Sequence, residues 1–125
     1  MQNNIFDLTG KTALITGAGG LLGPKHAEAI LDFGGTVILT DHHLDRVENK
    51  ARVLNEKYGE GSAVAYHMDV ADPLSVKAVV DVCERIDILI NNAAKDPKVK
   101  KEAGLTPDSR FETMTPEYWN EGVDA

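Results

Sequence analysis

The chain of 125 residues has little of what marks secreted, membrane-spanning and nucleic-acid-binding proteins. Its single cysteine, Cys83, excludes an internal disulfide, and its place on an apolar stripe at helical spacing predicts a core residue. No apolar run approaches the roughly 20 residues that span a bilayer, and the first residues lack the positive and apolar segments of a secretion signal. These absences predict a cytoplasmic protein without a membrane partner.

Positive charge is also scarce, since 13 Lys and Arg stand against 20 Asp and Glu. The formal net charge of −7 excludes the basic surface that nucleic acids select. Metal-ligand spacing is absent as well. His42 and His43 are adjacent and are expected to point apart, whereas ligands on a helix need a spacing of three or four residues. We therefore predict no metal site, and a single domain over residues 1–125.

What the chain does contain is a glycine-rich run, from Thr16 to Gly23, directly after the apolar stretch 13–15. The pattern is typical of a strand that turns into a helix around a phosphate, because helix N-termini present N–H groups to anions and only glycine lets the main chain come so close. Pro24 suits the first helical turn. The run therefore predicts a dinucleotide site, whose cofactor-binding residues are Gly17, Gly19, Gly20, Leu22 and Gly23.

An acid follows this run at the spacing that a dinucleotide site needs. Asp41 lies 24 positions after Gly17 and closes the apolar run 37–40. A carboxylate there accepts the ribose hydroxyls of an adenosine and repels a 2′-phosphate, for which His42 and His43 compensate weakly, so NAD is predicted in preference to NADP. The alternative is that Asp41 only caps the following helix.

Apolar runs alternate with segments of helical period, which predicts an α/β fold with a Rossmann-like parallel sheet flanked by helices. The strands are expected at 12–16, 37–41, 63–68 and 86–90, buried on both faces. Helices are expected at 22–33, up to Gly59, and from Pro73, capped by Asp72, to Arg85. Right-handed crossovers give the strand order 3-2-1-4. The fourth strand is then an apolar edge, so we expect a homo-oligomer.

Three motifs in order resemble the amino-terminal half of the short-chain dehydrogenase/reductase family. They are the glycine-rich run, the junction 68–70, and the segment 87–94, which reads Asp-Ile-Leu-Ile-Asn-Asn-Ala-Ala. The resemblance implies that Asp69 and Val70 contact the adenine, and that the segment from Asn91 to Ala93 lines the nicotinamide-ribose side and steadies the central strands. Taken without the resemblance, Asp69 is equally a turn former and residues 91–92 an ordinary turn at the end of a strand.

The chain departs from the family pattern at several positions. Leu21 stands where the common pattern has glycine, so the spacing of Gly17, Gly20 and Gly23 is similar to that of the family's extended members. Ala94 also stands where glycine is usual. The helix 73–85 is about one turn shorter than in the family, at 3.6 residues per turn.

The resemblance implies hydride transfer between a nicotinamide cofactor and an alcohol or carbonyl, catalysed by a Tyr-x-x-x-Lys pair. Residues 62, 70 and 122, four positions after the three tyrosines, are not lysine, so no catalytic residue is predicted here. A capped helix starting near Thr115 stops at the last residue, which predicts a truncated chain whose intact parent is the enzyme.

The segment 95–111 is predicted to be a polar loop over the strand ends. Its position is similar to that in family members that act on sugars, so a sugar derivative is the small-molecule substrate that we expect for the intact parent. A different class of function is also open, in which the chain is a non-catalytic module for nucleotide binding or self-association.

Overall fold

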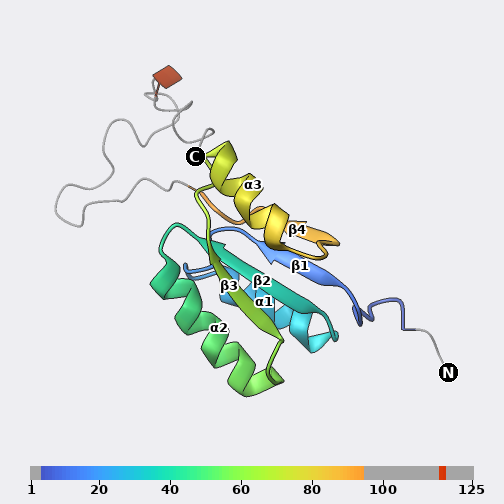
Figure 1. The fold of residues 1–125 in the computed structure, drawn as a ribbon. Coiled ribbons are helices and arrows are strands. Elements are labelled where there is room, and N and C mark those ends of the chain that lie inside the picture. Colours follow the sequence, from blue (N-terminus) through green and yellow to red (C-terminus); the bar gives the residue numbers. More distant parts are fainter. Residues whose placement is uncertain (1–3, 95–115, 118–125) are drawn as a thin grey trace. The chain divides into compact units, whose positions relative to one another are not determined.

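The computed structural model describes residues 4–94 and 116–117. The chain divides into two compact units, residues 1–93 and 94–125, and the first contains the sheet. Its elements in chain order are β1 (Thr12–Ile15), α1 (Gly23–Asp32), β2 (Thr36–Asp41), α2 (Leu44–Tyr58), β3 (Ala63–His67), α3 (Pro73–Val82) and β4 (Ile88–Ile90). The four strands are parallel in the order β3-β2-β1-β4, which confirms the predicted order (Figure 1).

Alternate residues of each strand face opposite sides of the sheet, and helices cover both sides (Figure 1). The first face carries α1 and α2, which pack on β1, β2 and β3. Its buried core consists of Ala13, Ile15, Ala18, Ala27, Leu31, Val37, Leu39, Val47, Ala51, Leu54 and Ala63. The second face carries α3 and has a smaller core of Leu14, Ile38, Met68 and Val79.

Local sequence signals set the limits of the helices on the first face. Pro24 occupies the first turn of α1, where its missing N–H costs nothing, and Gly34 follows the helix with φ of +89°. The inner face of α2 consists of Val47, Ala51 and Leu54, which recur at helical spacing and are buried. α2 ends at Tyr58, and the C-cap is Gly59, as expected from the sequence.

The predicted cap of α3 is also confirmed, because Asp72 accepts a hydrogen bond from the N–H of Leu74 at 3.0 Å and Pro73 opens the helix. The far end differs from the expectation. α3 ends at Val82 and β4 begins at Ile88, because Cys83 takes an extended backbone conformation and the following residues form a connection to the sheet. Cys83 is half-buried and packs against the smaller core, as predicted.

Burial on both faces holds for only two of the four strands. Three of the four residues of β1 and five of the six of β2 are buried, whereas β3 and β4 are largely half-buried or exposed. The prediction of four fully buried strands was therefore wrong for β3 and β4, which are edge strands of the part of the sheet that the structure describes.

The polar loop predicted at 95–111 lies outside the described residues, and of the helix expected near Thr115 only residues 116–117 are described. None of the helices in the described ranges combines the length and the apolar character that crossing a membrane would require.

Candidate functional site

The glycine-rich run forms a tight turn between β1 and α1 at the carboxyl end of the sheet. Gly17 has φ of +61°, in the left-handed region that favours glycine, and a Cβ there would lie 2.7 Å from the Cα of Ala93. The N–H of Gly20 donates to the carbonyl of Gly17 at 3.3 Å, and the N–H of Ala18 donates to the carbonyl of Thr40 at 2.9 Å. The turn is thus fixed between β2 and the end of β4.

Gly23 brings the start of α1 against this turn. A Cβ on Gly23 would lie 2.5 Å from the Cα of Ala18, so no larger residue fits without moving the backbone. The first N–H groups of a helix lack intrahelical acceptors. Within residues 4–94, the N–H groups of Leu21, Leu22 and Gly23 donate to no protein acceptor. The loop therefore offers three free donors at the positive end of a helix, which is where an anion binds.

Asp41 lies beside the loop, at the end of β2, and its side chain is only 8% exposed. Oδ2 accepts a hydrogen bond from the N–H of Gly19 at 3.0 Å, and Oδ1 accepts one from the N–H of His43 at 2.9 Å. His43 is the N-cap residue of α2 and makes no side-chain cap, so the alternative in which Asp41 caps this helix is wrong. The carboxylate instead joins the loop to the start of α2.

The end of β4 is fastened to the same loop by polar contacts. The hydroxyl of Thr16 accepts hydrogen bonds from the N–H groups of Asn92 and Ala93 at 3.1 and 3.0 Å. The side-chain amide of Asn92 donates to the carbonyl of Gly17 at 3.1 Å. Asn91, which the resemblance assigns to the site, is exposed and makes no such contact within the described residues. Asn92 belongs to the segment that the resemblance assigns to steadying the central strands, whereas sequence reasoning missed Thr16 as a residue that shapes the loop.

Asp69 forms a turn after β3. Its Oδ1 accepts a hydrogen bond from the N–H of Ala71 at 2.9 Å, and its own N–H donates to the hydroxyl of Ser75 at 2.9 Å. The turn-forming interpretation of Asp69 is therefore confirmed. Val70, the next residue, is 38% exposed. The adenine contact assigned to both residues stays a prediction.

The family model for short chain dehydrogenases matches residues 11–124. The chain belongs to this family. It is therefore a member of a family of oxidoreductases with an NAD(P)-binding Rossmann-type fold, which confirms the resemblance stated from the sequence.

Several members of the short chain dehydrogenase family are similar to this chain. An uncharacterized oxidoreductase of Bacillus subtilis is 40% identical over 93 residues, covering 71% of this chain and 33% of the relative. L-sorbose reductase of Gluconobacter frateurii, complexed with NADPH and L-sorbose, is 32% identical with a TM-score of 0.68, covering 80% of this chain and 39% of that one. The 3-ketoacyl-(acyl-carrier-protein) reductase of Brucella melitensis, complexed with NADH, is 28% identical with a TM-score of 0.67, covering 94% and 44%. The chain spans less than half the length of each.

The glycine spacing of this chain is accommodated without strain. Leu21 is 87% exposed and has no positive φ, so the loop does not require glycine at that position. Gly20 is the roomiest glycine of the loop, since the nearest atom to a Cβ there would be the carbonyl oxygen of Gly17 at 3.6 Å.

The two adjacent histidines beside the loop do not point apart. The ring centroids of His42 and His43 lie 3.9 Å apart, so that expectation was wrong. The cause is the backbone of His43, whose φ of −105° and ψ of 89° are not helical. His42 Nδ1 lies 3.5 Å from Oδ1 of Asp41. Among residues 4–94 and 116–117, no cluster of three His, Cys, Asp or Glu side chains could hold a metal ion.

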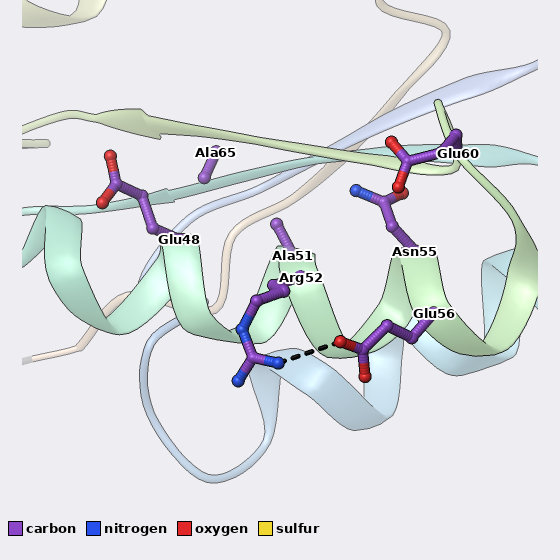
Figure 2. Close-up of a pocket in the computed structure, with 7 residues that line it drawn as sticks. All are labelled: Glu48, Ala51, Arg52, Asn55, Glu56, Glu60 and Ala65. Carbon is purple, nitrogen blue, oxygen red and sulfur yellow. Dashed lines mark hydrogen bonds and ion pairs between the residues drawn. The ribbon is translucent and has the colours of Figure 1, made fainter.

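A hollow of about 430 Å³ lies between α2 and β3, and none of its lining residues belongs to the glycine-rich loop (Figure 2). Three of these residues are glutamates, and Arg52 pairs with Glu56 at 3.0 Å. The lining residues are Glu48, Ala51, Arg52, Asn55, Glu56, Glu60 and Ala65. This acidic lining does not suit a phosphate, so the hollow is a poorer candidate for a dinucleotide site than the loop.

Proposed function

We propose that this chain is the NAD-binding portion of an oxidoreductase that transfers hydride between the nicotinamide and an alcohol or carbonyl. The observation that carries the proposal is the juxtaposition at the carboxyl end of the sheet. Three N–H groups just before and at the start of α1, which have no acceptor among the described residues, lie in the same loop as Gly19, whose own N–H contacts Asp41. Diphosphate and ribose are the two groups that this pair of features recognises.

The residues present fit a dinucleotide by two tests. First, the loop has no room for side chains where its backbone packs against neighbouring backbone. A Cβ at Gly17 or Gly23 would lie within 2.7 Å of backbone atoms. Second, a buried carboxylate ends β2, where the ribose would lie; His42 Nδ1 lies 3.5 Å from it, and no Lys or Arg of the described residues pairs with it. Leu22 and Gly23 would hold the diphosphate, and Asp41 the ribose. The cofactor supplies the hydride acceptor or donor when it is bound.

NAD is the proposed cofactor because of the charge at Asp41. A 2′-phosphate would place a second anion against a side chain that is 8% exposed and therefore poorly screened by water. The related structures do not agree on the cofactor, since one is complexed with NADPH and another with NADH. The preference therefore rests on Asp41. The substrate of the intact parent is proposed to be a sugar derivative, in line with the L-sorbose bound in a related reductase.

Calorimetric titration of the chain with NAD and NADP tests the proposal. NAD is expected to bind at least about tenfold more tightly than NADP, because placing like charges side by side costs more than the 1.4 kcal/mol that this factor represents. Gly23→Ala is expected to abolish binding of both, since its Cβ would overlap Ala18. Arg52→Ala, which removes only an exposed ion pair with Glu56, is the control and should bind NAD as the wild type does. Equal affinity for NAD and NADP would contradict the proposed preference, and absence of both would contradict the site.

A second measurement concerns turnover. No tyrosine of the 125 residues has a lysine four positions later, so the chain by itself is proposed to bind the cofactor without oxidising it. NADH absorbance is followed with a panel of aldoses, ketoses and simple ketones. Sustained oxidation above the buffer rate would show that the chain carries its own catalytic groups.

A further inference from the structure

Asp41 makes structural contacts within the protein in addition to the contact proposed with the ribose. Both of its carboxylate oxygens already accept main-chain N–H groups, from Gly19 at 3.0 Å and from His43 at 2.9 Å. Such bonds to a carboxylate are charge-assisted, and this side chain is 8% exposed, so water competes for it poorly. The carboxylate is therefore a structural link between the glycine-rich loop and the start of α2.

The loop backbone rests directly on this carboxylate. A Cβ on Gly19 would lie 2.9 Å from Oδ2 of Asp41 and 2.9 Å from the Cβ of Arg46 on α2. The main chain at position 19 thus fits between these two side chains, and the residue at position 41 determines where it lies. The free N–H groups of Leu21 and Leu22 follow two and three residues later in the same loop, so their direction depends on the same contact.

We propose that Asp41 is a positioning residue for the diphosphate-binding loop, in addition to its contact with the ribose. This inference rests on the proposed function of the loop. It has a consequence for the specificity of the site, because ribose recognition and diphosphate recognition share one side chain. Neutralising Asp41 to admit a 2′-phosphate also weakens the hold on the phosphate loop. The gain in NADP affinity from removing the charge is therefore partly offset by weaker binding of the diphosphate, and diphosphate ligands without a 2′-phosphate only lose affinity.

A nucleotide that lacks ribose hydroxyls separates the two roles. Isothermal titration of wild type, Asp41→Ala and Asp41→Asn is carried out with ADP and with 2′,3′-dideoxy-ADP. If Asp41 positions the loop, Asp41→Ala weakens dideoxy-ADP binding by about tenfold or more, the factor that corresponds to losing one charge-assisted hydrogen bond of about 1.5–3 kcal/mol. Asp41→Asn keeps an acceptor oxygen for the N–H of Gly19 and is expected to recover part of this affinity. Arg52→Ala, which removes an exposed ion pair with Glu56 on α2, should leave both affinities unchanged.

Amide hydrogen exchange of Gly19 measures the same link without any ligand. Exchange at Gly19 is expected to be about tenfold faster or more in Asp41→Ala than in wild type, and intermediate in Asp41→Asn, because the amide loses its acceptor. The exchange of amides in β1 is the reference for global stability. Faster exchange confined to the loop supports the proposal, whereas equal acceleration in β1 would mean only general destabilisation and would overturn it.

The outcomes distinguish this inference from the proposed function. If wild type binds both nucleotides and Asp41→Ala loses affinity for ADP alone, Asp41 acts only through the ribose hydroxyls and the inference is overturned. If wild type binds neither nucleotide, the proposed function fails and the inference about the ligand fails with it. The exchange of Gly19 then still decides whether Asp41 holds the loop.

Discussion

The two neighbours of β1 in the sheet are held in different ways. β2 pairs with β1 over four residues and β4 over three, both in parallel. Five of the six residues of β2 are buried, whereas no residue of β4 is, and Leu89 at its centre is 57% exposed. β2 is therefore stabilised by burial of apolar surface between helices, while β4 gains little from burial in the part of the chain that the structure describes.

Polar contacts at the two ends of β4 take the place of burial. Before the strand, Oδ2 of Asp87 accepts the N–H of Thr12 at 2.9 Å and pairs with Nε of Arg85 at 2.7 Å. After the strand, Thr16 accepts the N–H groups of Asn92 and Ala93. The second set of contacts also shapes the glycine-rich loop. A strand fixed by directed hydrogen bonds thus sets the geometry of the candidate site more closely than apolar packing would, because hydrogen bonds are directional.

The largest expected effect is a difference in unfolding stability between a matched pair of substitutions, one in β2 and one in β4. Leu39→Ala, in the core of β2, is expected to lower the free energy of unfolding by about 2–5 kcal/mol, because it leaves a cavity at a fully buried site. Leu89→Ala in β4 is the partner and should change it by less than about 1 kcal/mol, since the side chain is 57% exposed. Urea unfolding measures both. Equal losses would show that β4 is covered in solution, and the contrast between the strands would then disappear.

The next effect concerns the polar contact after β4. Thr16→Val keeps the shape of the side chain and removes the acceptor for two N–H groups, so unfolding stability is expected to fall by about 1–3 kcal/mol. Thr16→Ser retains the hydroxyl and is expected to lose less. The exchange rates of the Asn92 and Ala93 amides identify the site of the change. Unchanged exchange in Thr16→Val would mean that the hydroxyl does not hold the end of β4.

The smallest effect concerns the contact before β4 and depends on pH. The N–H of Thr12, and then Arg85, hold the pKa of Asp87 below its ordinary value of 3.8. A carboxyl with a lowered pKa in the folded state stabilises the fold above its unfolded pKa, and this contribution is lost as the pH falls through the folded value. Wild type is therefore expected to lose stability between about pH 4 and more acidic values.

Asp87→Asn removes the titrating group and serves as the test of this pH dependence. Thermal unfolding of wild type and variant is compared at pH 7 and at steps down to pH 3. The stability difference between the two is expected to shrink toward acid pH, because wild type loses the carboxylate charge that the variant lacks throughout. A difference that stays constant over this range would show that Asp87 does not titrate differently in the folded and unfolded states.

Much of the fold was predictable from local patterns, because period and capping are properties of short segments. The alternation of apolar runs and helical stripes predicted four parallel strands in the right order, and Asp72 and Gly59 were predicted at their helix ends. The end of α3 at Val82 and the start of β4 at Ile88 were not predicted. There no glycine or proline marks the end of the helix. The contact of Asp87 with Thr12 joins residues 75 positions apart and is invisible in a local window.

Some features of the candidate site were likewise predictable from local sequence, and others were not. Glycine at positions 17 and 23 followed from the need for a close approach of backbone, which is local chemistry that the chain displays in its order of residues. The hydrogen-bond partners of three residues could be known only from the folded structure, because each of these bonds joins segments that follow different strands. The three residues are Asp41, Thr16 and Asn92. Linear order establishes which groups the chain possesses and roughly which element carries each. Which donor meets which acceptor is fixed when the carboxyl ends of β1, β2 and β4 come to the same edge of the sheet, since a hydrogen bond depends on distances that only packing sets.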